Sequence, residues 1–313
     1  MGDTPSKYDT DWFTDADELG KPQTGLGKRD AAAVDKAKGM ADAFGKRGGK
    51  GLWPHVERAK VAAGLKYRLD NPDSFNQGQT WLCGIATFVR VWAYDHPVEY
   101  VQLAADLFEK GEGWLKGGPK TLVDKRSDGE KITASPDLLN SAVARISEKE
   151  SLDHADWVVL AAIRESFNSV FAYGADEGPF HIKAWNFPSD VVREFKAGGY
   201  SRVISKADGL GGGGYNNFVE ATDLYDRGWR VILLIKSDLL KASAFQNPGA
   251  VRTSDHWVGL NSTVFMSLPG PNCQVDRFEV YSWDGPHFIP PVGQKMAFSL
   301  FDKYYFGFVA GLH

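Results

Sequence analysis

The order of helix-like and strand-like segments restricts the fold of this chain most strongly. Apolar residues recur at helical spacing through the first two-thirds, most clearly over 97–110 and 155–171. The last third instead contains short apolar runs bounded by Gly, Pro and Asp, and residues 229–236 form one continuous run. Helices followed by strands are typical of α+β proteins. We therefore predict an α+β fold in which the helical part packs on a C-terminal antiparallel sheet.

Capping residues and breakers delimit the individual elements. Asp30 is an N-cap candidate, Pro97 suits a first helical position, and Gly198 and Gly228 follow helical segments. Helices are expected at 30–44, 51–69, from 83 onward, and at 97–110, 136–146, 155–171, 189–197 and 216–226. Strands are expected at 229–236, 256–262, 277–283 and 304–312.

The polar beginning of the chain divides it into two parts. Residues 1–29 are rich in Asp, Lys, Gly and Thr and offer little to bury. We expect residues 1–50 to be a mobile or loosely packed segment. Residues 51–313 are expected to form one domain, with a helical insertion around 97–200.

Composition excludes several classes of protein. A chain of 313 residues with 43% hydrophobic residues can bury a substantial core, and a formal charge of −4 gives no electrostatic reason to expect nucleic acid. Two cysteines cannot build a disulfide framework. No apolar run approaches a membrane span, and no signal-peptide core is present, so we expect synthesis in the cytoplasm and no transmembrane segment. No cofactor or metal-ligand spacing is evident.

The stretch from Asn76 to Trp92 carries the clearest chemical signal. It begins as a polar Asn-Gln-Gly loop and continues as an apolar helix, with Cys83 at the junction. Backbone N–H groups and the helix dipole favour a thiolate at such a position. Gln77 lies six residues upstream, where its side-chain amide could hold an oxyanion. The alternative is that Cys83 is a small buried hydrophobe in an apolar helix.

This stretch resembles the papain-like cysteine peptidases, in which Asn-Gln-Gly precedes the nucleophilic Cys by the same spacing. Gly84 departs from the aromatic residue that usually follows the nucleophile. The resemblance implies a papain-like fold, with Cys83 as nucleophile and Gln77 in the oxyanion hole. It covers the catalytic segments and the C-terminal sheet, but not residues 1–50 or 97–200.

The same resemblance assigns a base and an orienting acid. His256 opens a predicted strand downstream of Cys83, in the chain order of papain-like enzymes. Asp284 ends the next strand at a Gly-Pro turn, where bacterial bacteriocin-processing and secreted effector proteases place an orienting Asp. In a second register, Ser282-Trp283 matches the Ser-Trp after the orienting Asn of papain, which puts Tyr281 in the orienting position. The alternatives are a structural strand histidine and a turn-forming Asp.

The implied activity is that of a cysteine hydrolase that cleaves an amide through a thioester. The layout suggests a bacterial effector or toxin protease, exported without a signal peptide. Its partners would be a protein or peptide substrate from a host or competitor, and an inhibitor, chaperone or immunity protein. A glutamine deamidase, an acyltransferase or transglutaminase, and a non-catalytic partner-binding module remain open.

Two further expectations concern the site. Cys83 is expected to have a lowered pKa and to react with electrophiles near pH 6, unlike Cys273. The glycine-rich stretch 208–215 lacks the Lys-Ser/Thr of a phosphate loop and is expected to be a flexible loop over the site.

Overall fold

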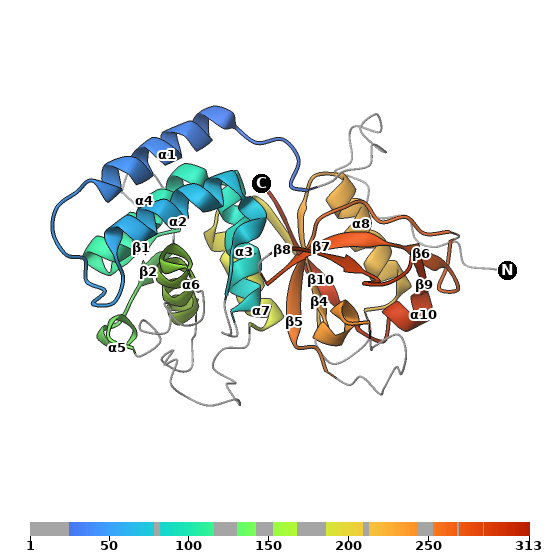
Figure 1. The fold of residues 1–313 in the computed structure, drawn as a ribbon. Coiled ribbons are helices and arrows are strands. Elements are labelled where there is room, and N and C mark those ends of the chain that lie inside the picture. Colours follow the sequence, from blue (N-terminus) through green and yellow to red (C-terminus); the bar gives the residue numbers. More distant parts are fainter. Residues whose placement is uncertain are drawn as a thin grey trace.

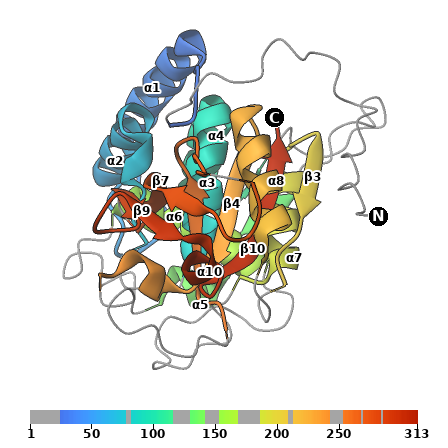
Figure 2. The same cartoon turned by 90° about the vertical axis from the view of Figure 1, so that its right-hand side faces the viewer.

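The computed structural model describes residues 25–77, 82–115, 130–141, 153–167, 186–208, 213–242, 253–267, 269–283 and 285–313. Helices gather on one side of the molecule and a twisted sheet on the other, with α3 between them (Figure 1). The turned view shows α8 and α10 on the outer side of the sheet (Figure 2). The α+β prediction is confirmed.

The helices begin and end where the local sequence requires. They are α1 (Ala31–Gly45), α2 (Arg58–Asp70), α3 (Cys83–Asp95), α4 (Pro97–Lys110), α5 (Pro136–Leu139), α6 (His154–Phe167), α7 (Pro188–Ala197), α8 (Tyr215–Asp226) and α10 (Phe298–Phe301). The Asp30 carboxylate accepts the backbone N–H groups of Ala32 and Ala33 and caps α1. Gly111 ends α4 in the left-handed conformation, with φ of 70°.

One antiparallel sheet of six strands forms the other half. Its order is β3 (Arg202–Ser205), β10 (Tyr305–Leu312), β4 (Arg230–Ile235), β5 (His256–Leu260), β7 (Phe278–Ser282) and β8 (Gly285–Ile289). Two small sheets pair β1 (Glu112–Trp114) with β2 (Lys131–Thr133), and β6 (Gln274–Asp276) with β9 (Lys295–Ala297). In the large sheet, Tyr305 pairs with Ile235, and Ile235 with His256, so these three residues lie at one end.

Each face of the large sheet covers its own core. Trp257 and Tyr281 join the core with the helical part, where Ile85, Phe88 and Val89 of α3 are buried. Val258, Leu260 and Val280 pack instead with α8 and α10. Alternate strand residues point to opposite faces, which accounts for this division. The N-terminal half of α3 therefore lies directly against β5.

Several expectations fail for identifiable reasons. Residues 25–45 are not loosely packed, because Ala37, Ala41 and Phe44 are fully buried against α2 and α4. The helix expected at 51–69 begins only at Arg58. Pro54 and the docking of the Trp53 indole N–H on the Leu107 carbonyl, at 3.0 Å, hold the preceding residues in another conformation. The short strands β1, β2, β3, β6, β8 and β9 were not predicted.

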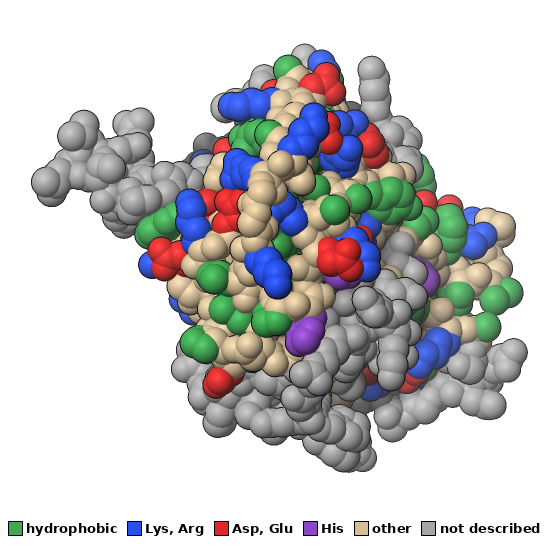
Figure 3. Space-filling model, turned by 60° about the vertical axis from the view of Figure 1, so that its left-hand side comes forward, with side chains coloured by type: hydrophobic (Ala, Val, Ile, Leu, Met, Phe, Trp, Pro, Cys, Tyr) green, Lys and Arg blue, Asp and Glu red, His purple; other side chains and the backbone are tan. Residues whose placement is uncertain are grey.

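The surface of the helical part carries both signs of charge. Figure 3 shows Lys and Arg side chains interspersed with Asp and Glu on this face. Lys66 pairs with Asp42 at 2.7 Å, and Arg47 pairs with Glu109 at 2.9 Å. No helix among the described residues is both long and apolar enough to cross a membrane.

Candidate functional site

Cys83 is the first residue of α3 and faces the beginning of β5. The Thr87 hydroxyl, one turn later, donates to the Cys83 carbonyl at 2.8 Å and lies 3.4 Å from the Trp257 carbonyl. The backbone N–H groups of Gly84 and Trp257 both point at the Cys83 sulfur. The sulfur therefore contacts the backbone of the residue that follows His256.

The electrostatics of Cys83 differ from the sequence prediction. Burial raises the pKa of its thiol to about 11, although the N–H groups of Trp257 and Gly84 oppose this shift. Loss of hydration disfavours a thiolate more than a few N–H dipoles favour it. The expectation of a low pKa and of reaction near pH 6 is therefore wrong for the unliganded protein. Cys83 rests as a neutral thiol.

His256 is the first residue of β5 and is only 4% exposed. Its Nε2 lies 2.6 Å from the Ser282 hydroxyl on the neighbouring strand. Its ring stacks on Trp283, with 4.9 Å between ring centroids. Burial lowers the pKa of His256 to about 4, and the nearby Asp255 carboxylate only partly opposes this. The imidazole is therefore neutral at physiological pH.

The sequence predicts only in part which residue contacts the His256 ring. Asp284, the predicted orienting acid, lies outside the described residues. Tyr281, the alternative, points toward the helical part, and its hydroxyl donates to the Phe75 carbonyl at 2.6 Å. The described residue that contacts a His256 ring nitrogen is Ser282. The signal for it was strand alternation, because residues on one face of adjacent strands meet diagonally.

Gln77 lies in the segment that precedes α3, where Phe75 is also buried. The Gln77 side chain is 6% exposed, and the Asn76 N–H beside it donates to Asp156 at 2.9 Å. Residues 78–81 lie outside the described part of the chain, so the contact of Gln77 with Cys83 stays a prediction.

The residue after Cys83 is a glycine because its side-chain space is occupied. A Cβ on Gly84 would lie 2.6 Å from Asn186 Nδ2 and 2.7 Å from its Cβ. The Asn186 side-chain amide donates to the buried Glu194 carboxyl at 2.8 Å. The backbone carbonyl of Asn186 accepts the Trp257 indole N–H at 2.9 Å. Burial raises the pKa of Glu194 to about 8. Asn186 thus takes the place that the aromatic residue would need.

No described contact joins the side chains of two predicted site residues. Cys83 lies against the backbone next to His256, and His256 contacts Ser282 and Trp283. The described contacts of the Cys83 sulfur are with backbone N–H groups, and a contact with the His256 ring stays a prediction. Gly213 donates its N–H to the Tyr305 carbonyl at 2.8 Å, at the same end of the sheet as His256. Residues 209–212 of the expected covering loop lie outside the described residues.

Comparison with known proteins adds no family assignment. No protein-family model matches this chain, and neither a curated protein nor a solved structure matches it.

Proposed function

We propose that this chain is a papain-like cysteine hydrolase that cleaves an amide bond through a thioester. One observation carries the proposal: the cysteine that begins α3 lies against the backbone of β5 beside a buried histidine. This histidine is itself held by a hydroxyl from the next strand. A nucleophile, a base and a group that orients the base are the parts that acyl transfer requires.

The base acts from a neutral resting state. In the tautomer that donates Nε2–H to Ser282, the lone pair of His256 is on Nδ1. This atom takes the thiol proton as the Cys83 sulfur attacks the carbonyl carbon. It returns the proton to the departing amine as the C–N bond breaks, which leaves a thioester. Water then hydrolyses the thioester and releases Cys83. Gln77 and the Cys83 N–H would hold the oxyanion formed in each half.

The proposal extends to the biological role suggested by the sequence. A bacterial effector or toxin with a protein substrate fits it, and a deamidase or an acyltransferase would use the same groups. These activities differ in the amine that leaves or in the acceptor of the acyl group.

A non-catalytic binding module is the second candidate, and one observation favours it. Both Cys83 and His256 are neutral in the resting structure. The raised pKa of Cys83 and the lowered pKa of His256 disfavour a thiolate–imidazolium ion pair. A protein that only binds a partner would retain the fold and show no turnover.

Turnover of a mixture of dipeptidyl aminomethylcoumarin amides, together with ammonia release from a glutamine-rich protein, decides between these functions. We expect Cys83→Ala and His256→Ala to abolish turnover, with a stability cost for Cys83→Ala of about 1 kcal/mol or less. Cys273→Ala is the control and should keep full activity. Asp284→Ala and Ser282→Ala test which residue orients His256. The variant that lacks the orienting residue should keep part of the turnover rate.

Unchanged turnover in a folded Cys83→Ala protein would refute the hydrolase. Absence of all turnover and ammonia release by the unmodified chain would favour the binding module.

A further inference from the structure

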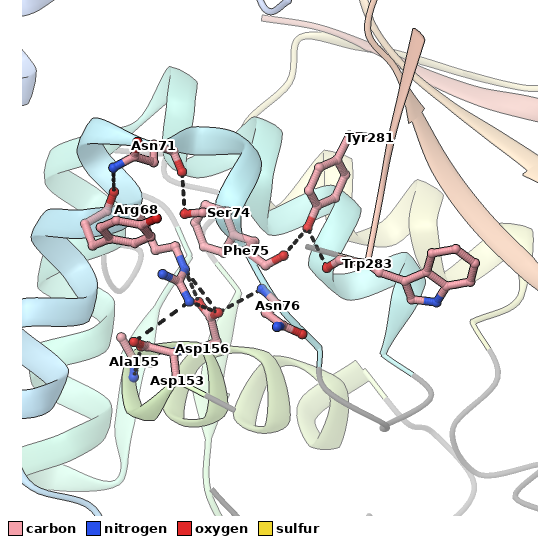
Figure 4. A network of polar contacts seen from close by, with 11 residues as sticks. Arg68, Asn71, Ser74, Phe75, Asn76, Asp153, Ala155, Asp156, Tyr281 and Trp283 are labelled. Atoms are coloured by element: carbon pink, nitrogen blue, oxygen red, sulfur yellow. Dashed lines mark hydrogen bonds and ion pairs between the residues drawn. The ribbon is translucent and has the colours of Figure 1, made fainter. Parts of the chain in front are cut away.

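A buried polar network lies directly behind the loop that carries Gln77 (Figure 4). Arg68 of α2 and Asp156 of α6 form an ion pair at 2.6 Å, with the Arg68 Nε 3.1 Å from each carboxylate oxygen. Asp156 is fully buried and Arg68 is 6% exposed. A buried pair of this kind is costly to desolvate and is weak evidence for stability alone.

The Asp156 carboxylate also binds the loop. Its Oδ2 accepts the backbone N–H of Asn76 at 2.9 Å. Asn76 is the residue before Gln77. Arg68 orients the carboxylate from one side, so the oxygen that faces the loop cannot turn away without breaking the pair. The ion pair therefore fixes the position of one backbone atom next to the predicted oxyanion donor.

Tyr281 holds the same loop from the sheet. Its hydroxyl donates to the Phe75 carbonyl at 2.6 Å and lies 3.4 Å from the carbonyl of Trp283, whose ring stacks on His256. The side chain is 1% exposed, and the Arg90 guanidinium lies 4.7 Å from the ring centroid. One phenol thus connects the loop before Cys83 with the residue that covers the base.

We propose that Asp156, oriented by Arg68, and Tyr281 are positioning residues that hold the Phe75–Gln77 loop so that Gln77 can stabilise an oxyanion at Cys83. This inference rests on the proposed hydrolase function. Neither residue touches the reacting atoms. Both act on the loop backbone, from elements that are far apart in the sequence.

The charge on Asp156 makes this positioning sensitive to pH. Burial raises the pKa of Asp156 to about 6, and Arg68 only partly opposes it. Among the described residues, Asp156 also interacts with Asp153 just before α6, with the Tyr100 phenol of α4 and with the Tyr281 phenol of β7. Below pH 6 the carboxylate becomes protonated, its pair with Arg68 weakens, and the loop loses an anchor.

Two small probes separate positioning from general disruption. In a Cys273→Ala background, Cys83 is the only thiol. Acylation by p-nitrophenyl acetate passes through an oxyanion, whereas alkylation by iodoacetamide does not. Both reactions remove the thiol proton of Cys83, so the ratio of the two rates largely cancels a change in how readily that proton is lost. The rate of the Cys83→Ala protein is subtracted as background.

We expect Asp156→Asn and Tyr281→Phe to lower this ratio by about tenfold to a hundredfold. This is less than the roughly hundredfold to thousandfold cost of losing an oxyanion donor itself, because the donor is displaced and not deleted. In the unmodified chain the ratio should fall as the pH drops through 6, and Asp156→Asn should remove this step. Asp153→Asn makes the same charge change at the residue before α6, where an Asn oxygen can still accept the Ala155 N–H that Asp153 caps. It does not touch the loop. Tyr225→Phe deletes another phenol that bonds a carbonyl, that of Gly25, at 2.6 Å. Both controls should keep the ratio.

An unchanged ratio in Asp156→Asn and Tyr281→Phe would overturn the positioning role, as would an equal fall of both rates. If Cys83 of the unmodified chain is not acylated above background, the hydrolase proposal itself fails. That failure appears before any loop variant is tested.

Discussion

The buried neutral imidazole of His256 should make the stability of the fold depend on pH in a defined way. Burial lowers its pKa from 6.5 to about 4. Between these values the unfolded chain binds a proton that the folded chain does not. The contribution is therefore fully present above pH 6.5 and is lost as the pH falls toward 4.

The magnitude follows from the shift. Going from pH 7 to pH 4.5, linkage gives a loss of about 2.4 kcal/mol from this one group. Asp156 and Glu194 act in the opposite direction, because burial raises their pKa values to about 6 and about 8. The pH dependence of the unmodified protein alone is therefore uninformative. The difference from His256→Asn cancels these carboxyls and isolates the imidazole.

Urea unfolding followed by tryptophan fluorescence at pH 7 and pH 4.5 measures the effect. The stability of the unmodified protein relative to His256→Asn should fall by about 2 kcal/mol on acidification, and His256→Gln should give the same change. As a control, the unfolding free energy should depend on urea concentration with the same slope in all proteins, which indicates that they share one unfolded state. A relative stability that is constant within about 0.5 kcal/mol would show that the ring is solvated.

Three further predictions concern the surroundings of Cys83. Alkylation of Cys83 by iodoacetamide should be slow at pH 7 and rise about tenfold per pH unit toward pH 10, because burial raises the thiol pKa to about 11; a plateau reached below pH 8 would contradict this. Gly84→Ala should cost about 1–3 kcal/mol of unfolding free energy, since the new methyl would overlap Asn186; a thermal melt at unchanged temperature would count against the contact. Glu194→Gln should become more stable relative to the unmodified protein as the pH rises from 5 to 8, because burial raises the folded-state pKa of Glu194 to about 8. Urea unfolding at both pH values tests the sign of this change. A difference in unfolding free energy that stays constant would refute it.

Sequence patterns located most long elements of this fold, because their signals are local. Asp30 caps α1, Pro97 begins α4, and α3 begins at Cys83, as caps, proline geometry and apolar spacing indicated. Five of the six unpredicted strands have only three or four residues, which hold too little periodicity, and their partners are distant in the chain. β1, for example, pairs with β2 seventeen or more residues later. β8 has five residues and pairs with the adjacent β7, but it begins with Gly-Pro, which the sequence pattern marks as a turn.

The site shows the same division between local and distant information. Cys83 and His256 are predicted as site residues from flanking residues and chain order. The pKa values could not be read that way, because they depend on burial by elements distant in sequence. The role of Asp156 could not be predicted for another reason: an apolar helix that is buried on most sides gives no sign of which segment its buried carboxylate will contact.

The neutral states of Cys83 and His256 are related to the group that contacts the imidazole, the Ser282 hydroxyl. An ionised carboxylate beside His256 would stabilise the imidazolium and hold its pKa up, which would in turn favour a thiolate at Cys83. The hydroxyl of Ser282, 2.6 Å from Nε2, fixes the tautomer and the ring plane but brings no charge. Burial then outweighs the opposing effects of the Asp255 carboxylate on His256 and of the Trp257 and Gly84 N–H groups on Cys83, so the pKa of His256 is lowered and that of Cys83 is raised. Proton transfer from the thiol must therefore accompany attack on the carbonyl, when the developing oxyanion provides the missing counter-charge. A hydrolase built in this way would depend on its oxyanion loop more strongly than one with a preformed ion pair. This places the anchoring of Phe75–Gln77 by Asp156 and Tyr281 at the centre of its chemistry.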